Sequence, residues 1–243
     1  MKVDINCDVG EGVANEHLIM PYISSCNIAC GGHFGDKQTI DKTIQLAAEN
    51  GVKIGAHPSF PDKKKFGRRF MELSKTKLKE SITYQLDLFL ERLSLVQKEL
   101  HHIKPHGALY NAIAVDEQLA KTIVEILKPY LNSAFLYVPY NSVIAKIALQ
   151  SDVKIKYEAF ADRNYNDDLT LVSRAKKKAL LADKSDVLNH VIFILKHNKV
   201  KTISGLKVPI KADTFCVHGD SENVLEIVSH LHRQLQKEGF VIR

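Results

Sequence analysis

The sequence predicts an α/β protein that folds as a parallel (β/α) barrel, either seven-stranded or a distorted relative of the TIM barrel. Two observations predict this fold. Short apolar runs of strand length alternate with longer segments of helical periodicity along the whole chain. Polar clusters that contain His with Gly or Pro follow four of the apolar runs, and the carboxyl ends of parallel strands are where such barrels carry their sites. An open doubly wound sheet, which also binds ligands at the carboxyl ends of its strands, is the alternative.

The composition is that of an ordinary globular protein. The chain has 243 residues, of which 45% are hydrophobic and 26% charged, so disorder is excluded and one barrel domain over residues 1–243 is expected. No apolar run reaches the length of about 18 residues that indicates a membrane span, and no signal-peptide segment is recognisable. The expected location is therefore the cytoplasm.

The formal charge of +6 does not indicate a nucleic-acid-binding protein. The Lys-rich segments 63–65 and 176–178 are scattered and lack interleaved aromatic residues, so they are expected to face solvent. A basic site would also suit a small anionic substrate. The four cysteines form no Cys-x-x-Cys pair, which favours buried, reduced thiols over a zinc site or a disulfide framework.

Seven apolar runs supply the expected strands. They lie at residues 2–7, 23–31, 52–56, the start of 102–111, 134–138, 153–160 and 213–217. In the first run, Val3 and Ile5 alternate with polar neighbours, which is the period of a strand. A long loop is expected at 59–69 and an accessory hairpin or loop at 200–209.

Helical spacing of apolar residues marks the segments between the strands. The expected helices cover residues 37–50, 75–93, 116–130, 142–149 and 187–197, with a closing helix after residue 220. Asp36 and Ser74 are expected to cap the first two, and Gly51 ends the first. Asp220 or Ser221 is expected to cap the last.

Histidines lie where four of the expected strands end, at His33, His57, His106 and His218. A single His in such a place is more often structural than functional. Each of these four, however, has Gly within two residues or Pro beside it, which indicates backbone held close to something at a site. The candidate catalytic residues are Asp8, Glu11, His33, His57, Lys104, His106 and His218.

Two interpretations of this set stay open. In a metal site, Asp8, His33 and His57 would bind a divalent ion, with His106 or His218 as further ligands, although no metal-binding spacing lies on one helix. In a metal-free site, Asp8 or Glu11 would act as a general base and a His as a general acid or oxyanion donor.

Basic residues in the same motifs suggest a place for an anion. Lys104, Arg68 and Arg69 would hold an anionic substrate. Further candidates for substrate or phosphate binding are Asn6, Asn111, Asp162, Arg163 and Asp220. The competing interpretations are a solvent-facing pair for Arg68 and Arg69, a barrel-end salt bridge for Lys104, and an internal ion pair for Asp162 with Arg163. Neither the dinucleotide-binding glycine motif nor the phosphate-binding loop motif is present.

Six motifs follow one another along nearly the whole chain. They are Asp4-x-Asn6-Cys7-Asp8-x-Gly10-Glu11, Asn27-Ile28-Ala29-Cys30-Gly31-x-His33-x-Gly35-Asp36, Gly55-Ala56-His57-Pro58 with Phe66-Gly67-Arg68-Arg69, Lys104-Pro105-His106-Gly107-Ala108-Leu109-Tyr110-Asn111, Phe160-Ala161-Asp162-Arg163-x-Tyr165, and Asp213-Thr214-x-Cys216-Val217-His218-Gly219-Asp220. Together and in this order they resemble the LamB/YcsF family, the A subunits of bacterial 5-oxoprolinase.

The resemblance implies a barrel related to glycoside hydrolases and polysaccharide deacetylases. It also implies the opening of 5-oxo-L-proline to L-glutamate with ATP as cosubstrate, together with B and C subunits, and it leaves a bound divalent metal and a homo-oligomer open. Because the chain lacks a phosphate-binding loop, we expect it to perform the hydrolytic half of the reaction, with ATP handled at an unusual site or mainly by a partner. Two alternatives are a stand-alone metal-dependent deacetylase or amidohydrolase acting on a sugar or small amide, and a carrier or regulatory subunit that only binds a small anion.

Overall fold

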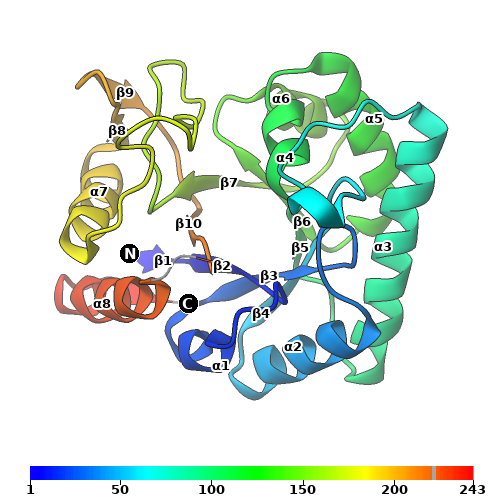
Figure 1. Ribbon diagram of the computed structural model, residues 1–243. Coiled ribbons are helices and arrows are strands. Elements are labelled where there is room, and N and C mark those ends of the chain that lie inside the picture. The colour runs from blue at the N-terminus through cyan, green and yellow to red at the C-terminus, as the bar shows by residue number, and fades with distance from the viewer. Residues whose placement is uncertain (221–222, 243) are drawn as a thin grey trace.

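The computed structural model describes residues 1–220 and 223–242 and confirms the predicted parallel barrel. Its strands are β2 (Ile5–Val9), β3 (Ser25–Ala29), β4 (Lys53–His57), β5 (His102–Ile103), β6 (Phe135–Pro139), β7 (Ile155–Phe160) and β10 (Thr214–Val217). Their spatial order is β10-β2-β3-β4-β5-β6-β7, and every neighbouring pair is parallel. Because β10 also pairs with β7, the sheet is closed (Figure 1), and the open-sheet alternative is wrong.

Helices surround the barrel on its outer side (Figure 1). They are α1 (Glu16–Ile19), α2 (Lys37–Glu49), α3 (Lys75–Leu95), α4 (Gly107–Ile113), α5 (Glu117–Leu127), α6 (Val143–Gln150), α7 (Lys184–His197) and α8 (Val224–Lys237). Short 3₁₀ turns cover Met20–Tyr22, Lys63–Lys65 and Lys128–Tyr130. The accessory hairpin is present as the antiparallel strands β8 (Lys199–Lys201) and β9 (Lys207–Pro209).

The main helices bury the apolar stripes that their spacing predicts. α3 buries Leu78, Ile82, Leu86, Leu88, Phe89 and Leu93, and each fully buried side chain of this size contributes about 1.5–3 kcal/mol of transfer free energy. The predicted caps of the first two long helices are confirmed, since the carboxylate of Asp36 accepts from Thr39 N and the hydroxyl of Ser74 accepts from Lys77 N. These side chains accept hydrogen bonds from backbone N–H groups of the first helical turn, which have no acceptor within the helix.

The chain termini differ from the prediction. The expected strand 2–7 is divided, because β1 (Lys2–Val3) pairs outside the barrel with β11 (Val241–Ile242), while the barrel strand begins at Ile5. Local alternation could not show this division, which depends on residues at the other end of the sequence. The first and last strands of the described chain consequently lie side by side.

The cap expected for the closing helix is also corrected. α8 begins at Val224 after Asn223, which makes no side-chain cap bond. Asp220 lies too far before the helix to cap it, and its carboxylate pairs with Arg68 instead. The other expected cap, Ser221, lies outside the described residues.

Polar side chains fill part of the barrel interior and set the position of the site. Asn27 Nδ2 donates to Oδ1 of Asn6 and to Oδ1 of Asp8, at 2.7 Å in both cases. His102 Nε2 donates to Asn27 Oδ1 over 2.6 Å, and Asn6 Nδ2 donates to Thr214 Oγ1 over 2.8 Å. These side chains are all buried, so the mutual hydrogen bonds offset the cost of removing them from water. The network therefore fixes the position of Asp8 at the carboxyl end of the barrel.

Candidate active site

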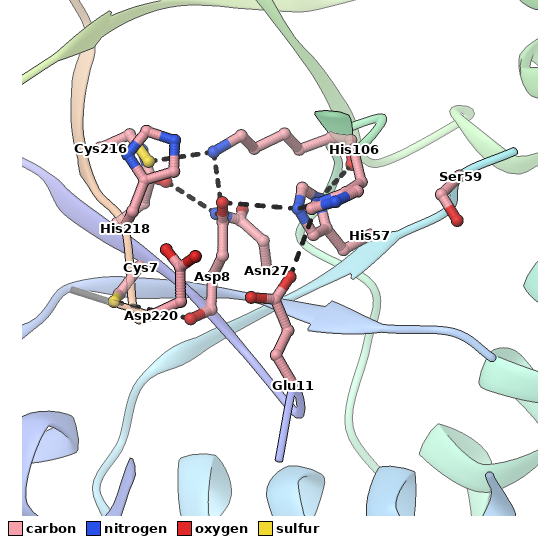
Figure 2. A network of polar contacts seen from close by, with 12 residues as sticks. Cys7, Asp8, Glu11, Asn27, His57, Ser59, His106, Cys216, His218 and Asp220 are labelled. Carbon is pink, nitrogen blue, oxygen red and sulfur yellow. Dashed lines mark hydrogen bonds and ion pairs between the residues drawn. The ribbon is translucent and has the colours of Figure 1, made fainter. Parts of the chain in front are cut away.

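A cavity of about 630 Å³ lies beside the carboxyl ends of the barrel strands. Its lining includes Asp8 from β2, His57 from β4, Glu158 and Phe160 from β7, and His218 directly after β10. The loop that begins at residue 104 adds further polar groups. The strand-end clusters predicted from the sequence therefore meet at one mouth. Figure 2 shows how Asp8, Glu11, His57 and His106 lie toward one another.

Two imidazole groups in the site have fixed tautomers. His57 Nδ1 lies 2.6 Å from the carbonyl oxygen of Lys104, and His106 Nε2 lies 2.9 Å from that of Phe66. A carbonyl oxygen can only accept, so each of these nitrogens carries a proton and donates it. In the neutral rings, His57 Nε2 and His106 Nδ1 are therefore bare acceptors.

These two bare nitrogens face each other. His57 Nε2 and His106 Nδ1 are 2.9 Å apart, and His57 Nε2 is 3.5 Å from Asp8 Oδ2. Two lone pairs at this separation repel unless a cation lies between them. The geometry therefore suits either a proton shared by the two rings or a bound metal ion.

The third imidazole, His33, is oriented by Ser59. Because Ser59 Oγ donates to the carbonyl of Phe60 over 2.9 Å, it accepts from His33 Nδ1 over 3.0 Å. His33 Nε2 is then left as an acceptor, 2.9 Å from Glu11 Oε1. If both groups are neutral, this contact is a hydrogen bond only when the carboxyl group of Glu11 carries a proton and donates it to His33 Nε2.

The electrostatics of Glu11 and His33 agree with that assignment. Burial and the negative charge of Asp8 raise the pKa of Glu11 to about 8, so its carboxyl group keeps its proton at neutral pH. Burial and the charge of His57 lower the pKa of His33 to about 2. A neutral carboxylic acid therefore donates to a neutral imidazole. The His33 ring also stacks on His106, with ring centroids 3.7 Å apart.

Asp8 is held as an anion by Lys104. Burial opposes ionisation, but the ammonium group of Lys104 and the ring of His57 hold the pKa of Asp8 well below its usual value. Lys104 Nζ lies 2.9 Å from Asp8 Oδ1, 3.0 Å from Glu158 Oε1 and 3.1 Å from Cys216 Sγ. Nζ donates hydrogen bonds to Asp8 and Cys216, whereas its contact with Glu158 Oε1 is an ion pair without hydrogen-bond geometry. This arrangement matches the barrel-end salt bridge considered for Lys104.

His218 forms a separate pair with Asp162. His218 Nδ1 lies 2.9 Å from Asp162 Oδ1, and the backbone N–H of His218 donates to Asp162 Oδ2. Burial raises the pKa of the Asp162 carboxyl group, but the charge and the hydrogen bonds of His218 lower it by more. The internal ion pair of Asp162 with Arg163, considered as the competing interpretation, does not form, because Asp162 pairs with His218 and Arg163 donates to the carbonyl oxygens of Val172 and Ala179.

The remaining predicted residues are divided between the cavity and the scaffold. Arg68 lines the cavity and pairs with Asp220, and Asn111 lines it without a side-chain hydrogen bond to another described residue. Asn6 is buried and engaged inside the barrel. Arg69 is exposed and is not one of the cavity-lining residues.

The set of residues that could hold a metal differs from the predicted one. Asp8, His57 and His106 bring one ligand atom each within 4.8 Å of one another, and Glu11, His33 and His106 form a second such group. The predicted set of Asp8, His33 and His57 is corrected, because His106 and not His33 lies with the other two. The outer N–H groups of all three rings are anchored on protein acceptors, as is usual for metal-ligating histidines.

Three residues of the site are not among the predicted candidate residues, although Asn27 begins one of the quoted motifs. Asn27 and Ser59 orient Asp8 and His33, and Glu158 shares Lys104 with Asp8. Asn27 and Glu158 lie inside β3 and β7, two residues before the last residue of each strand. The alternation of side chains along a strand would have placed Glu158 on the same face as Phe160.

The fold and the site define a parallel α/β barrel with a buried centre of histidines and carboxylates at the carboxyl ends of its strands. The chain belongs to the LamB/YcsF family, whose profile matches residues 3–243. It is 42% identical to the A subunit of 5-oxoprolinase from Pyrococcus abyssi over 98% of this chain and 96% of that protein. It is 39% identical to the protein of the same name from Staphylococcus haemolyticus, over 100% and 99%. The crystal structure of a lactam utilization protein from Thermus thermophilus matches with a TM-score of 0.94 and 32% identity, covering 100% of this chain and 99% of that one.

No helix among the described residues is long and apolar enough to cross a membrane.

Proposed function

We propose that this chain is the lactam-hydrolysing component of an ATP-dependent 5-oxoprolinase, which opens 5-oxo-L-proline to L-glutamate while ATP is converted to ADP and phosphate. The observation that carries the proposal is the convergence of Asp8, His57 and His106 on one point at the edge of the cavity. The similarity over the full chain to proteins named as the A subunit of 5-oxoprolinase supports the choice of substrate.

The chemistry sets the tasks of the site. A five-membered lactam is a stable amide, so phosphorylation of its oxygen would create an activated imidate that water can attack. The attacking water loses a proton while its oxygen bonds to the lactam carbon, and the ring nitrogen gains a proton as the carbon–nitrogen bond breaks. Ring opening leaves an acyl phosphate, and a second water displaces inorganic phosphate from it to give the side-chain carboxylate of glutamate. The site must therefore hold one base, one acid and an anionic substrate.

The facing nitrogens of His57 and His106 are suited to receive the proton of the water. The Asp8 anion beside them stabilises the resulting imidazolium, as a carboxylate does in acid–base dyads. Glu11 keeps its proton at neutral pH and is the acid of the site. Arg68 and Arg163, which line the cavity, supply positive charge toward an anionic substrate.

The same residues fit a divalent ion, with Asp8, His57 and His106 as its ligands. When bound there, such an ion would act as a Lewis acid and lower the pKa of a water molecule. This arrangement favours the second candidate function, a stand-alone metal-dependent amidohydrolase or deacetylase. The absence of a phosphate-binding loop motif supports the view that B and C subunits handle ATP.

One experiment tests the proposal and its rival. The chain is purified alone and together with the B and C subunits, and 5-oxoproline-dependent release of phosphate and glutamate is measured beside the metal content of the same samples. We expect little ATP hydrolysis from the single chain and coupled release of both products from the complex. Robust ATP-dependent turnover by the single chain would contradict the division of labour. Hydrolysis without ATP that is abolished by chelation would favour the rival.

A further inference from the structure

The segment 168–175 forms one wall of the main cavity and carries Arg174. The wall also includes Arg163, which lies at the start of the irregular region that follows β7. Two arginines therefore line the space in which the substrate is expected. Neither has a carboxylate within ion-pair distance among residues 1–220 and 223–242.

Arg163 is buried with its charge only partly satisfied. It is 5% exposed, and its Nη2 and Nε donate to the carbonyl oxygens of Val172 and Ala179 over 2.6 and 3.3 Å. These bonds fasten the irregular region to the barrel. They leave Nη1 without a hydrogen-bond acceptor in the described part of the chain.

The positive charge of Arg174 also acts on the buried positive charge of Arg163. Burial lowers the pKa of Arg163, and the positive charge of Arg174 lowers it further, while the carboxylate of Asp162 raises it. Asp162 forms no ion pair with Arg163, because its two oxygens accept from His218. A buried charge without a paired counter-charge is costly. A structural role for Arg163 explains its two carbonyl contacts, but it explains neither the free Nη1 nor the second cation beside it.

We propose that Arg163 and Arg174 form an oxyanion subsite that takes the carboxylate or the phosphoryl group of the substrate. An anion between the two guanidinium groups would offset both the burial of Arg163 and the repulsion by Arg174. The planar fork of donors in a guanidinium group matches the oxygens of carboxylate and phosphate. The identity of the substrate rests on the proposed function, whereas the anion chemistry rests on the two arginines.

The test is a binding titration on the full chain, independent of turnover. Inorganic phosphate and 5-oxoproline are the anionic probes, and 2-pyrrolidinone, which is the same lactam without a carboxylate, is the uncharged probe. Arg174→Gln should weaken binding of an anionic probe about tenfold or more. It should leave binding of 2-pyrrolidinone unchanged. Loss of phosphate binding alone assigns the subsite to the phosphoryl group, and loss of 5-oxoproline binding assigns it to the carboxylate.

The matched control is Lys177→Gln, which removes one exposed positive charge from the same region but does not line the cavity. Equal effects of the two substitutions would show a long-range charge effect and overturn the proposal. The absence of anion binding to the native chain, or unchanged binding in Arg174→Gln, would also overturn it. Circular dichroism of each variant checks that the fold is intact. Failure of the complex to hydrolyse 5-oxoproline would reject the proposed function without altering these binding results.

Discussion

Asp8 and Glu11 lie three residues apart, yet their surroundings shift their pKa values in opposite directions. Asp8 is beside the ammonium of Lys104, while Glu11 is buried beside the charge of Asp8 and the neutral ring of His33. A pair of carboxyl groups that differ in this way can supply a base and an acid at the same pH. The sequence could nominate both residues, but it could not assign the roles, because the assignment depends on contacts with His33 and Lys104, which follow β3 and β5 and lie far away in the chain.

The anionic form of Asp8 should be essential for turnover. Asp8→Asn keeps the shape of the side chain but removes the charge that stabilises His57 and compensates Lys104. We expect a fall in kcat of about 10²–10⁴-fold, the range for loss of acid–base function. The measurement is glutamate release by the complex. Asp41→Asn, which alters an exposed carboxylate paired with Arg92, is the control, and a carrier role for this chain would predict full activity for both variants.

Protonated Glu11 should make the stability of the protein depend on pH. The pKa is about 8 in the folded chain and near 4.5 in the unfolded chain, so between these values the folded state holds one more proton. The contribution of this group is fully present below pH 4.5 and is lost as the pH rises through 8. The corresponding slope of unfolding free energy is about −1.4 kcal/mol per pH unit.

Glu11→Gln should remove this pH-dependent contribution to the free energy of unfolding. Denaturant unfolding of both proteins between pH 5 and 8, roughly the interval in which the two states differ in protonation, gives the difference in slope. We expect the free energy of unfolding of Glu11→Gln to fall less steeply with rising pH than that of the native chain. Parallel curves for the two proteins would show that Glu11 is already ionised in the folded state and would contradict the proton assignment at His33.

At the scale of elements, most strands and helices could be predicted because their side-chain periods are local. The seven barrel strands and the caps at Asp36 and Ser74 followed from such patterns. For the segment 200–209 the patterns left a hairpin or a loop open, and the structure has the hairpin. The division of the first strand did not follow from them, because it depends on pairing with β11. The cap expected at Asp220 was also wrong, and the carboxylate of that residue pairs with Arg68. Glu158 was missed because only barrel closure brings it to Lys104.

The turn between β5 and α4 should be intolerant of a side chain at Gly107. This residue has φ of +56°, and a Cβ atom there would lie 2.7 Å from the carbonyl oxygen of Gly67. That carbonyl accepts from Ala108 N, so the clash would displace the loop that carries His106. We expect Gly107→Ala to cost about 1–3 kcal/mol of stability and to lower kcat.

Gly205→Ala is the matched control for that substitution. Gly205 also has positive φ, at +94°, but nothing lies within 4 Å of the position that a Cβ atom would take there. Thermal unfolding and glutamate release are measured for both variants. Loss of stability without loss of activity is expected for Gly205→Ala. The same behaviour in Gly107→Ala would show that the position of His106 does not depend on this close backbone contact.

At the scale of the whole molecule, the barrel closes only when the last strand, β10, reaches both β2 and β7. The short pair β1–β11 then joins the two ends of the chain outside the barrel. The cavity residues come from the opposite ends of the strands, as Asp8 and His218 do. The terminal pair should therefore contribute to stability without contributing to the site.

Val241→Pro tests that separation. The backbone N–H of Val241 donates to the carbonyl oxygen of Met1 over 3.0 Å, and proline has no N–H to donate. We expect the free energy of unfolding to fall by about 1 kcal/mol, the net contribution of one hydrogen bond, while kcat of the complex is unchanged. Val241→Thr retains the N–H and is the control for the altered side chain. A loss of activity confined to the proline variant would show instead that the terminal pair is coupled to Asp8 through β2, since β1 and β2 are separated only by Asp4.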